Sequence, residues 1–146
     1  MKIPAKISPE TEQRVRASFA AQSMMTTLGA RLVALMPGET RIEAPILPGS
    51  RQQHGFGHAG LTFAIGDSAA GYAALSVMAD DHEVLTTEMK IHLLAPARGD
   101  LLIARGRVIK SGRRLVIVQA DIHAIEAGQE THIALMTGTM IPIAPT

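Results

Sequence analysis

The sequence predicts an α+β fold in which an antiparallel sheet of five or six strands wraps around one long central helix. Helical spacing of apolar residues over residues 58–77, and a two-residue alternation that begins near residue 85, are the main observations behind this prediction. The chain has 146 residues, the usual length of one globular domain. We therefore expect a single domain over residues 1–146, with its core at about 29–142.

The first expected element is an additional N-terminal helix over residues 9–27. Ser8 is a typical N-cap residue, and Pro9 suits the first turn of a helix. Apolar residues then recur at helical spacing until Gly29, which is a typical helix stop.

Two short strands follow, over residues 30–35 and 40–44. Pro37 and Gly38 lie between them and form a turn dipeptide, so the two strands are expected to pair as a hairpin. Residues 45–57 contain two prolines and three glycines and are expected to form a loop.

The long central helix is expected over residues 58–77. Apolar or small residues occupy most of its positions, and five of them keep a spacing of three or four: Leu61, Ile65, Ser68, Tyr72 and Leu75. A helix with so few polar positions must be covered by the rest of the protein.

Four longer strands complete the prediction, over residues 85–93, 101–110, 115–125 and 131–141. Apolar and polar residues alternate in each of them, and short turn segments separate the last three. We expect the four strands to form an antiparallel meander. Long edge strands invite pairing with a second subunit, which predicts a dimer.

Composition excludes several classes of protein. The net charge of +1 and the near absence of aromatic residues argue against a nucleic-acid partner. The absence of cysteine removes disulfides and a cysteine nucleophile, and it indicates the cytoplasm. No apolar run approaches the ~18 residues of a membrane helix, and the N-terminus is polar, so neither a membrane partner nor a signal peptide is expected.

Two apparent motifs lack the context that their function needs. Residues 55–60 read GxGxxG, but no apolar parallel strand precedes them, so the glycines are better explained by a tight turn into the helix. His54 and His58 stand four apart but are separated by loop residues, which disfavours a zinc site. We expect no metal ion and no bound cofactor.

Asp67 is the strongest catalytic candidate because it is the only acidic residue in residues 58–77. Its neighbours on the helix are mostly small, and a buried carboxylate is costly unless it is paired or hydrogen-bonded. The alternatives are a catalytic carboxylate and a structural one that a neighbouring strand or an arginine satisfies.

Two further features could contact a substrate. Backbone N–H groups at Ala59 and Gly60, at the start of the long helix, could hold a carbonyl oxygen or an oxyanion. Lys110, Arg113 and Arg114 crowd one turn, where they could bind a phosphorylated ligand or simply be solvated.

The segments HGFGHAGLTFAIGDSAAGYAAL and VLTTEMKIHLLAPARGDLLIARGRVIKSGRR resemble the hotdog-fold acyl-CoA thioesterases of the phenylacetate-degradation (PaaI-like) type. The resemblance covers residues 50–141. It implies a hotdog fold and hydrolysis of an acyl-CoA to a carboxylic acid and coenzyme A. Many relatives carry Gly where this chain has Ala59, and Asn where it has Gln52.

The resemblance also implies roles for particular residues. Asp67 would act as general base or as nucleophile, and the N–H of Ala59 would polarise the carbonyl. Thr86, with Thr87 as the alternative register, would hold the attacking water. The remaining residues would line the pocket or contact coenzyme A: Gln52, His58, Gly60, Lys110, Arg113 and Arg114.

In such thioesterases the active site lies between two subunits, and dimers commonly pair into tetramers. Two other functions stay open at this point. One is a non-catalytic protein that binds acyl-CoA or an acyl carrier. The other is a hotdog enoyl hydratase or dehydratase, in which His58 and Asp67 would form the catalytic pair.

Overall fold

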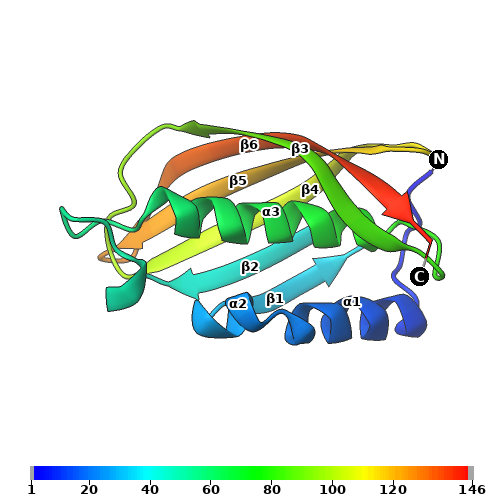
Figure 1. The fold of residues 1–146 in the computed structure, drawn as a ribbon, viewed down its shortest axis with the longest axis horizontal. Coiled ribbons are helices and arrows are strands. Elements are labelled where there is room, and N and C mark those ends of the chain that lie inside the picture. The colour runs from blue at the N-terminus through cyan, green and yellow to red at the C-terminus, as the bar shows by residue number, and fades with distance from the viewer. Residues whose placement is uncertain (1, 145–146) are drawn as a thin grey trace.

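The computed structural model describes residues 2–144 and shows a mixed α+β arrangement (Figure 1). Its helices are α1 (Pro9–Ala21), α2 (Ser23–Thr27) and α3 (Ala59–Leu75), with a short 3₁₀ helix at Pro48–Ser50. Its strands are β1 (Arg31–Met36), β2 (Glu39–Pro45), β3 (Glu83–Leu93), β4 (Leu101–Ser111), β5 (Val116–Glu126) and β6 (Gln129–Ile143). The predicted fold class and the long central helix are confirmed.

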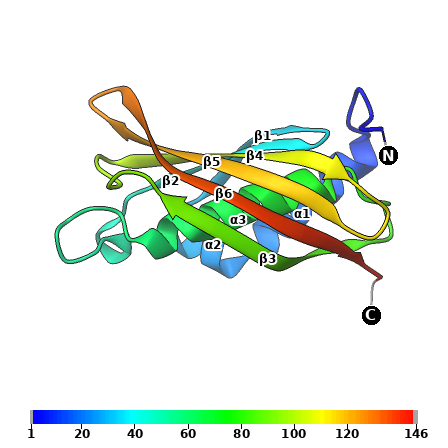
Figure 2. The same cartoon turned by 90° about the horizontal axis from the view of Figure 1, so that it is seen from above.

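All six strands form one antiparallel sheet in the order β1-β2-β4-β5-β6-β3. The predicted meander of four strands is wrong in one respect, because β3 pairs with β6 rather than with β4. The connection after β3 runs beside the loop that precedes α3, where the N–H of Gly57 donates to Ala97 O at 2.8 Å. This crossing leaves β1 and β3 at opposite edges of the sheet (Figure 2).

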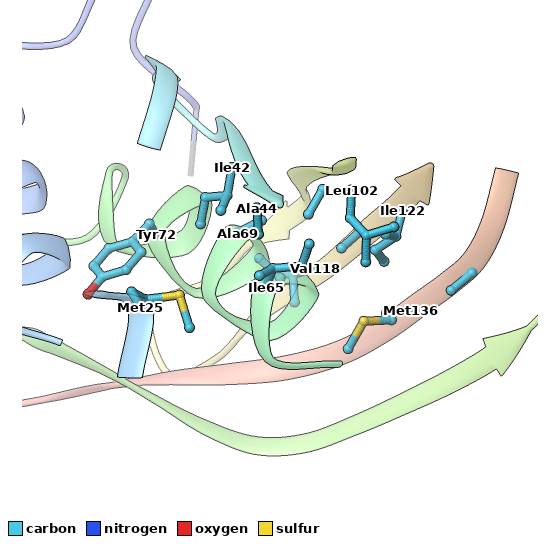
Figure 3. Close-up of a cluster of buried hydrophobic side chains, with 14 of the residues drawn as sticks. Met25, Ile42, Ala44, Ile65, Ala69, Tyr72, Leu102, Val118, Ile122 and Met136 are labelled. Carbon is cyan, nitrogen blue, oxygen red and sulfur yellow. The ribbon is translucent and has the colours of Figure 1, made fainter. Parts of the chain in front are cut away.

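Helix α3 lies across one face of the sheet, and most of its residues are buried (Figure 1). The close approach depends on small residues, since a Cβ at Gly106 of β4 would overlap the backbone of Ala69. The hydroxyl of Thr40 on β2 also donates to Ala69 O at 2.7 Å. Aliphatic residues and methionines fill the space between helix and sheet, among them Ile42, Ile65, Leu102, Val118, Ile122 and Met136 (Figure 3).

The predicted N-terminal helix over residues 9–27 is broken at Gln22, which separates α1 from α2. The start agrees with prediction, since the Ser8 hydroxyl accepts from the N–H of Thr11 at 3.1 Å. Gln22 has an extended backbone (φ −75°, ψ 101°), and its side chain bonds inward to Tyr72 of α3. This tertiary contact explains a break that helical spacing alone does not predict.

Arg14 fastens α1 to the C-terminal end of α3. Its guanidinium donates to Leu75 O at 3.0 Å, to Ala79 O at 2.7 Å and to His82 O at 2.9 Å. Carbonyl groups at a helix C-terminus lack partners within the helix and carry partial negative charge. A cation there stabilises both the helix end and the position of α1.

Strand β3 contains a β-bulge at Thr87, because its register against β6 shifts between Thr86 and Glu88. The bulge reverses which residues face the core. Thr86 bonds to α3 before it, and Met89 packs on the core after it. The regular alternation expected over residues 85–93 would place Leu85 on the same face as Met89, but Leu85 is 50% exposed. No helix in residues 2–144 is long and apolar enough to cross a membrane.

Candidate active site

Asp67 lies in the middle of α3, half-buried, and faces the start of β3. The hydroxyl of Thr86 donates a hydrogen bond to Asp67 Oδ1 at 2.9 Å. The same hydroxyl oxygen lies 3.1 Å from Met140 Sδ, but the carboxylate is the stronger acceptor. Asp67 is therefore held by a neutral hydroxyl, and no ion pair to it is present among residues 2–144.

Burial raises the pKa of Asp67 above its ordinary value of 3.8, and the hydrogen bond from Thr86 opposes this shift. Desolvation disfavours the charged carboxylate, whereas the hydroxyl stabilises it. A carboxylate with a raised pKa is a stronger base than an ordinary aspartate, which suits proton abstraction near neutral pH.

A cavity of about 340 Å³ opens beside Asp67. Three elements provide its walls: the end of α1, the middle of α3 and the start of β3. The residues that line it are Ser18, Gln22, Asp67, Ser68, Gly71, Tyr72, Glu83, Val84, Leu85 and Thr86. Apart from Asp67 and Thr86, sequence reasoning assigned none of these to the site, and no motif marks Ser18, Gln22 or Glu83.

The bulge in β3 places the side chains of Thr86 and Thr87 in different surroundings. Thr86 bonds to Asp67, whereas the hydroxyl of Thr87 donates to Thr139 O of β6 at 3.0 Å and its side chain is exposed. Thr87 thus lies away from the cavity.

The N-terminus of α3 presents a backbone donor at Ala59. His58 is the N-cap, and its Nδ1 accepts a hydrogen bond from the N–H of Gly60 at 2.7 Å. The N–H of Ala59 has no hydrogen-bond partner within residues 2–144. Because the N–H of Gly60 is already bonded to His58, the N–H of Ala59 is the donor that remains for a carbonyl oxygen.

A second cavity, of about 490 Å³, adjoins this helix end. Its lining includes Gln52, Phe56, Ala59 and Leu93, but not His58. The side-chain oxygen of Gln52 accepts from the N–H of His54, which holds Gln52 in the loop, so its amide nitrogen is the group left for the cavity.

The two cavities are separate within one chain. Ala59 and Asp67 are eight residues apart on α3, which is about 12 Å along the helix axis. The cavity at Asp67 borders the start of β3, and the cavity at Ala59 borders its end. One chain therefore does not bring its own carboxylate and its own backbone donor to the same atom.

The basic residues predicted to contact coenzyme A lie far from Ala59. Lys110 is the last residue but one of β4, while Arg113 and Arg114 belong to the turn before β5, and all three are exposed. Arg113 borders a small cavity with Met78, just beyond the C-terminus of α3. Within residues 2–144, no group of His, Asp and Glu side chains is arranged to hold a metal ion.

The family model of the thioesterase superfamily matches residues 54–130. This range includes all the residues of α3 that line the two cavities. A crystal structure of a thioesterase family protein from Silicibacter pomeroyi is 43% identical, with a TM-score of 0.91. That match covers 92% of this chain and 99% of the other.

Two more distant structures show the same fold. The PaaI protein of the Escherichia coli phenylacetic acid degradation operon has 22% identity and a TM-score of 0.84, covering 96% of this chain and 98% of its own. A thioesterase from Haemophilus influenzae has 19% identity and a TM-score of 0.81, covering 97% and 96%. Among curated proteins, no relative matches the chain.

Proposed function

We propose that this chain, which belongs to the thioesterase superfamily and is a thioester hydrolase, cleaves an acyl-CoA to a free carboxylic acid and coenzyme A. The expected resemblance to PaaI-like thioesterases and the hotdog fold are confirmed by these comparisons. The observation that supports the proposed mechanism most is the half-buried Asp67, hydrogen-bonded to Thr86 beside an open cavity.

In the proposed mechanism, the Asp67 carboxylate takes a proton from water, and the resulting hydroxide attacks the thioester carbon. The N–H of Ala59 donates to the carbonyl oxygen, which becomes an oxyanion in the tetrahedral intermediate. Collapse of the intermediate breaks the carbon–sulfur bond, and the coenzyme A thiolate takes up the proton that Asp67 removed from water, which restores the carboxylate. The hydroxyl of Thr86 orients the Asp67 carboxylate, and the carboxylate in turn positions the water.

Asp67 has a second available role, as nucleophile. Its carboxylate oxygen would attack the thioester carbon and expel the thiolate, leaving a mixed anhydride that water then hydrolyses. Both routes use the same two groups, a carboxylate on α3 and a backbone donor at the start of α3.

We further propose that the two groups come from different subunits. Strand β3 is an edge strand of 11 residues, and Leu85 and Leu93 on it are 50% and 58% exposed. Unpaired edges of this length, with apolar side chains, favour pairing with another strand. A second copy of β3 is the partner expected.

Antiparallel pairing of two β3 strands would align the start of one with the end of the other. It would therefore bring the Asp67 cavity of one chain against the Ala59 cavity of its partner, twice per dimer. A register centred on Met89 would also oppose Glu88 to Lys90 of the partner subunit, an attractive cross-strand pair. Further pairing of dimers into tetramers stays a prediction, as does a cytoplasmic location.

The basic turn of Lys110, Arg113 and Arg114 is proposed to contact the phosphates of coenzyme A, because all three cations are exposed. Hydratase chemistry is less well supported, since His58 lines neither the cavity at Ala59 nor the cavity at Asp67. A hydratase would need that imidazole directed at the substrate.

The test is thiol release from acyl-CoA by Asp67→Asn. We expect kcat to fall by about 10²-fold or more, because removal of a general base or nucleophile has effects of that size. Asp100→Asn is the matched control, since that side chain is fully exposed, and it should retain full activity. Near-normal thiol release by Asp67→Asn, with the fold intact, would refute the mechanism. Tight acyl-CoA binding without turnover by the unmodified chain would identify a binding protein instead.

A further inference from the structure

One wall of the Asp67 cavity is polar, and the side chain of Gln22, between α1 and α2, is at its centre. The side-chain Nε2 of Gln22 donates to the hydroxyl of Tyr72 at 2.9 Å, and its Oε1 accepts from the Ser68 hydroxyl at 3.4 Å. The Ser18 and Tyr72 hydroxyl oxygens are 3.3 Å apart. We call Ser18, Gln22, Ser68 and Tyr72 the polar wall. The Tyr72 hydroxyl points from α3 toward the N-terminal helices (Figure 3).

The backbone break between α1 and α2 places Gln22 in this wall. The extended backbone of Gln22 ends α1. The side chain of Gln22 is half-buried and lines the cavity beside α3. Phe19, one turn earlier, packs edge to face on Tyr72 with ring centroids 5.7 Å apart. The backbone conformation of Gln22 and the packing of Phe19 on Tyr72 together fix the position of the Gln22 carboxamide.

The Gln22 carboxamide retains hydrogen-bonding capacity. It has two N–H donors and an oxygen with two lone pairs, and within residues 2–144 one donor and one lone pair are used. A donor and an acceptor are therefore available to a ligand in the cavity. An apolar group placed against them would remove them from water without a replacement partner.

The polar wall begins at the residue next to the catalytic carboxylate and extends about one helical turn further along α3. Ser68 follows Asp67 directly, and Tyr72 is four residues after Ser68, so Gln22 spans a turn of about 5.4 Å between its two partners. An acyl chain of about four or five atoms would cover a length of this order from a thioester carbon beside Asp67 to Gln22. The cavity, at about 340 Å³, is near the lower end of ligand sites.

The charge around the cavity is negative. Glu83 lies on its lining, and this carboxylate contributes, after burial, to the raised pKa of Tyr72. Among the described residues that line the cavity, none is Lys or Arg. An acyl group that ends in a carboxylate would be repelled by both Asp67 and Glu83.

We propose that Gln22 determines acyl specificity and selects short, neutral acyl groups that carry a terminal hydroxyl. The hydroxyl would both donate to Oε1 and accept from Nε2 of the carboxamide. This inference rests on the proposed hydrolysis at Asp67, because it requires the thioester carbon to lie beside that carboxylate.

The experiment compares kcat/KM for three acyl-CoA thioesters of nearly equal size: 4-hydroxybutyryl, pentanoyl and succinyl. They present a hydroxyl, a methyl and a carboxylate at nearly the same position. We expect 4-hydroxybutyryl-CoA to be preferred over pentanoyl-CoA by about tenfold, as for a hydrogen bond whose absence leaves polar groups unpaired. Succinyl-CoA should be the poorest substrate.

Gln22→Leu should abolish or reverse the preference for hydroxyl over methyl. Gln22→Met, which is unbranched and of similar volume, replaces it if the Leu variant does not fold. Gln13→Leu on the exposed side of α1 is the matched control and should keep the preference.

Equal rates for the hydroxyl and methyl substrates in the unmodified chain would overturn the inference, as would an unchanged preference in both Gln22 variants. Asp67→Asn measured with the same substrates separates the two proposals. If Asp67→Asn loses hydrolysis while the unmodified chain shows no preference between the hydroxyl and methyl substrates, only the role of Gln22 is refuted.

Discussion

Thr86→Val tests how the carboxylate of Asp67 is held. Valine has nearly the same shape as threonine but lacks the hydroxyl that donates to Asp67 Oδ1 at 2.9 Å. That hydrogen bond stabilises the charged form and lowers the pKa, against the larger effect of burial. Its removal should therefore raise the pKa of Asp67 further.

The size of the shift follows from the hydrogen bond. Hydrogen bonds to charged groups contribute roughly 1.5–3 kcal/mol, and the half-exposed position of Asp67 argues for the lower end, about 1.5 kcal/mol. That free energy corresponds to about one pKa unit. The acidic limb of the pH profile of kcat/KM should move to higher pH by about this amount.

The assay is thiol release across the pH range for the unmodified chain, Thr86→Val and Thr86→Ser. Serine keeps the hydroxyl, so its acidic limb should stay close to that of the unmodified chain. An acidic limb that does not move in Thr86→Val, with activity retained, would show that Thr86 does not control the ionisation of the catalytic group.

Three other predictions concern stability and assembly. The pKa of Asp67 is raised above 3.8, so its contribution to stability is fully present below that pH and lost as pH rises through the folded-state value. Asp67→Asn avoids this loss, and its advantage in melting temperature should grow as pH rises above about 4. Gly106→Ala should cost about 2 kcal/mol or more in chemical denaturation, because the added Cβ overlaps the α3 backbone, whereas Gly49→Ala meets nothing and should be neutral. Leu93→Glu, at the exposed β3 edge, should yield monomers without activity in analytical ultracentrifugation and thiol release, and Met24→Glu, equally exposed on α2, should not.

Periodicity and turn residues predict most elements of this fold. The long helix, the first hairpin and the later strands all end within a few residues of their expected positions, because burial of one face requires the pattern that is visible in the sequence. Strand order was not predictable in full. A strand with the pattern of β3 can pair with β4 or β6, and the crossing of residues 94–100 decides between them.

The candidate site was predictable where a single residue type stands out. Asp67 is conspicuous as an acid among small and apolar residues, and the structure places it beside a cavity. The bulge at Thr87 left no signal in the alternation, so the sequence could not choose between Thr86 and Thr87. Gln22 was missed because its role depends on a helix break that a tertiary contact produces.

The central claim is that each active site combines Asp67 of one subunit with the Ala59 N–H of another. Ala59→Pro removes that donor at the first helical position, where proline is tolerated, and circular dichroism should show an intact helix. Asp67→Asn and Ala59→Pro should each be inactive alone. Dissociated and reassociated together in equal amounts, they should recover about a quarter of normal thiol release, since half of the dimers would be hybrids with one complete site each. Activity no greater than the sum of the two separate variants would contradict a shared site.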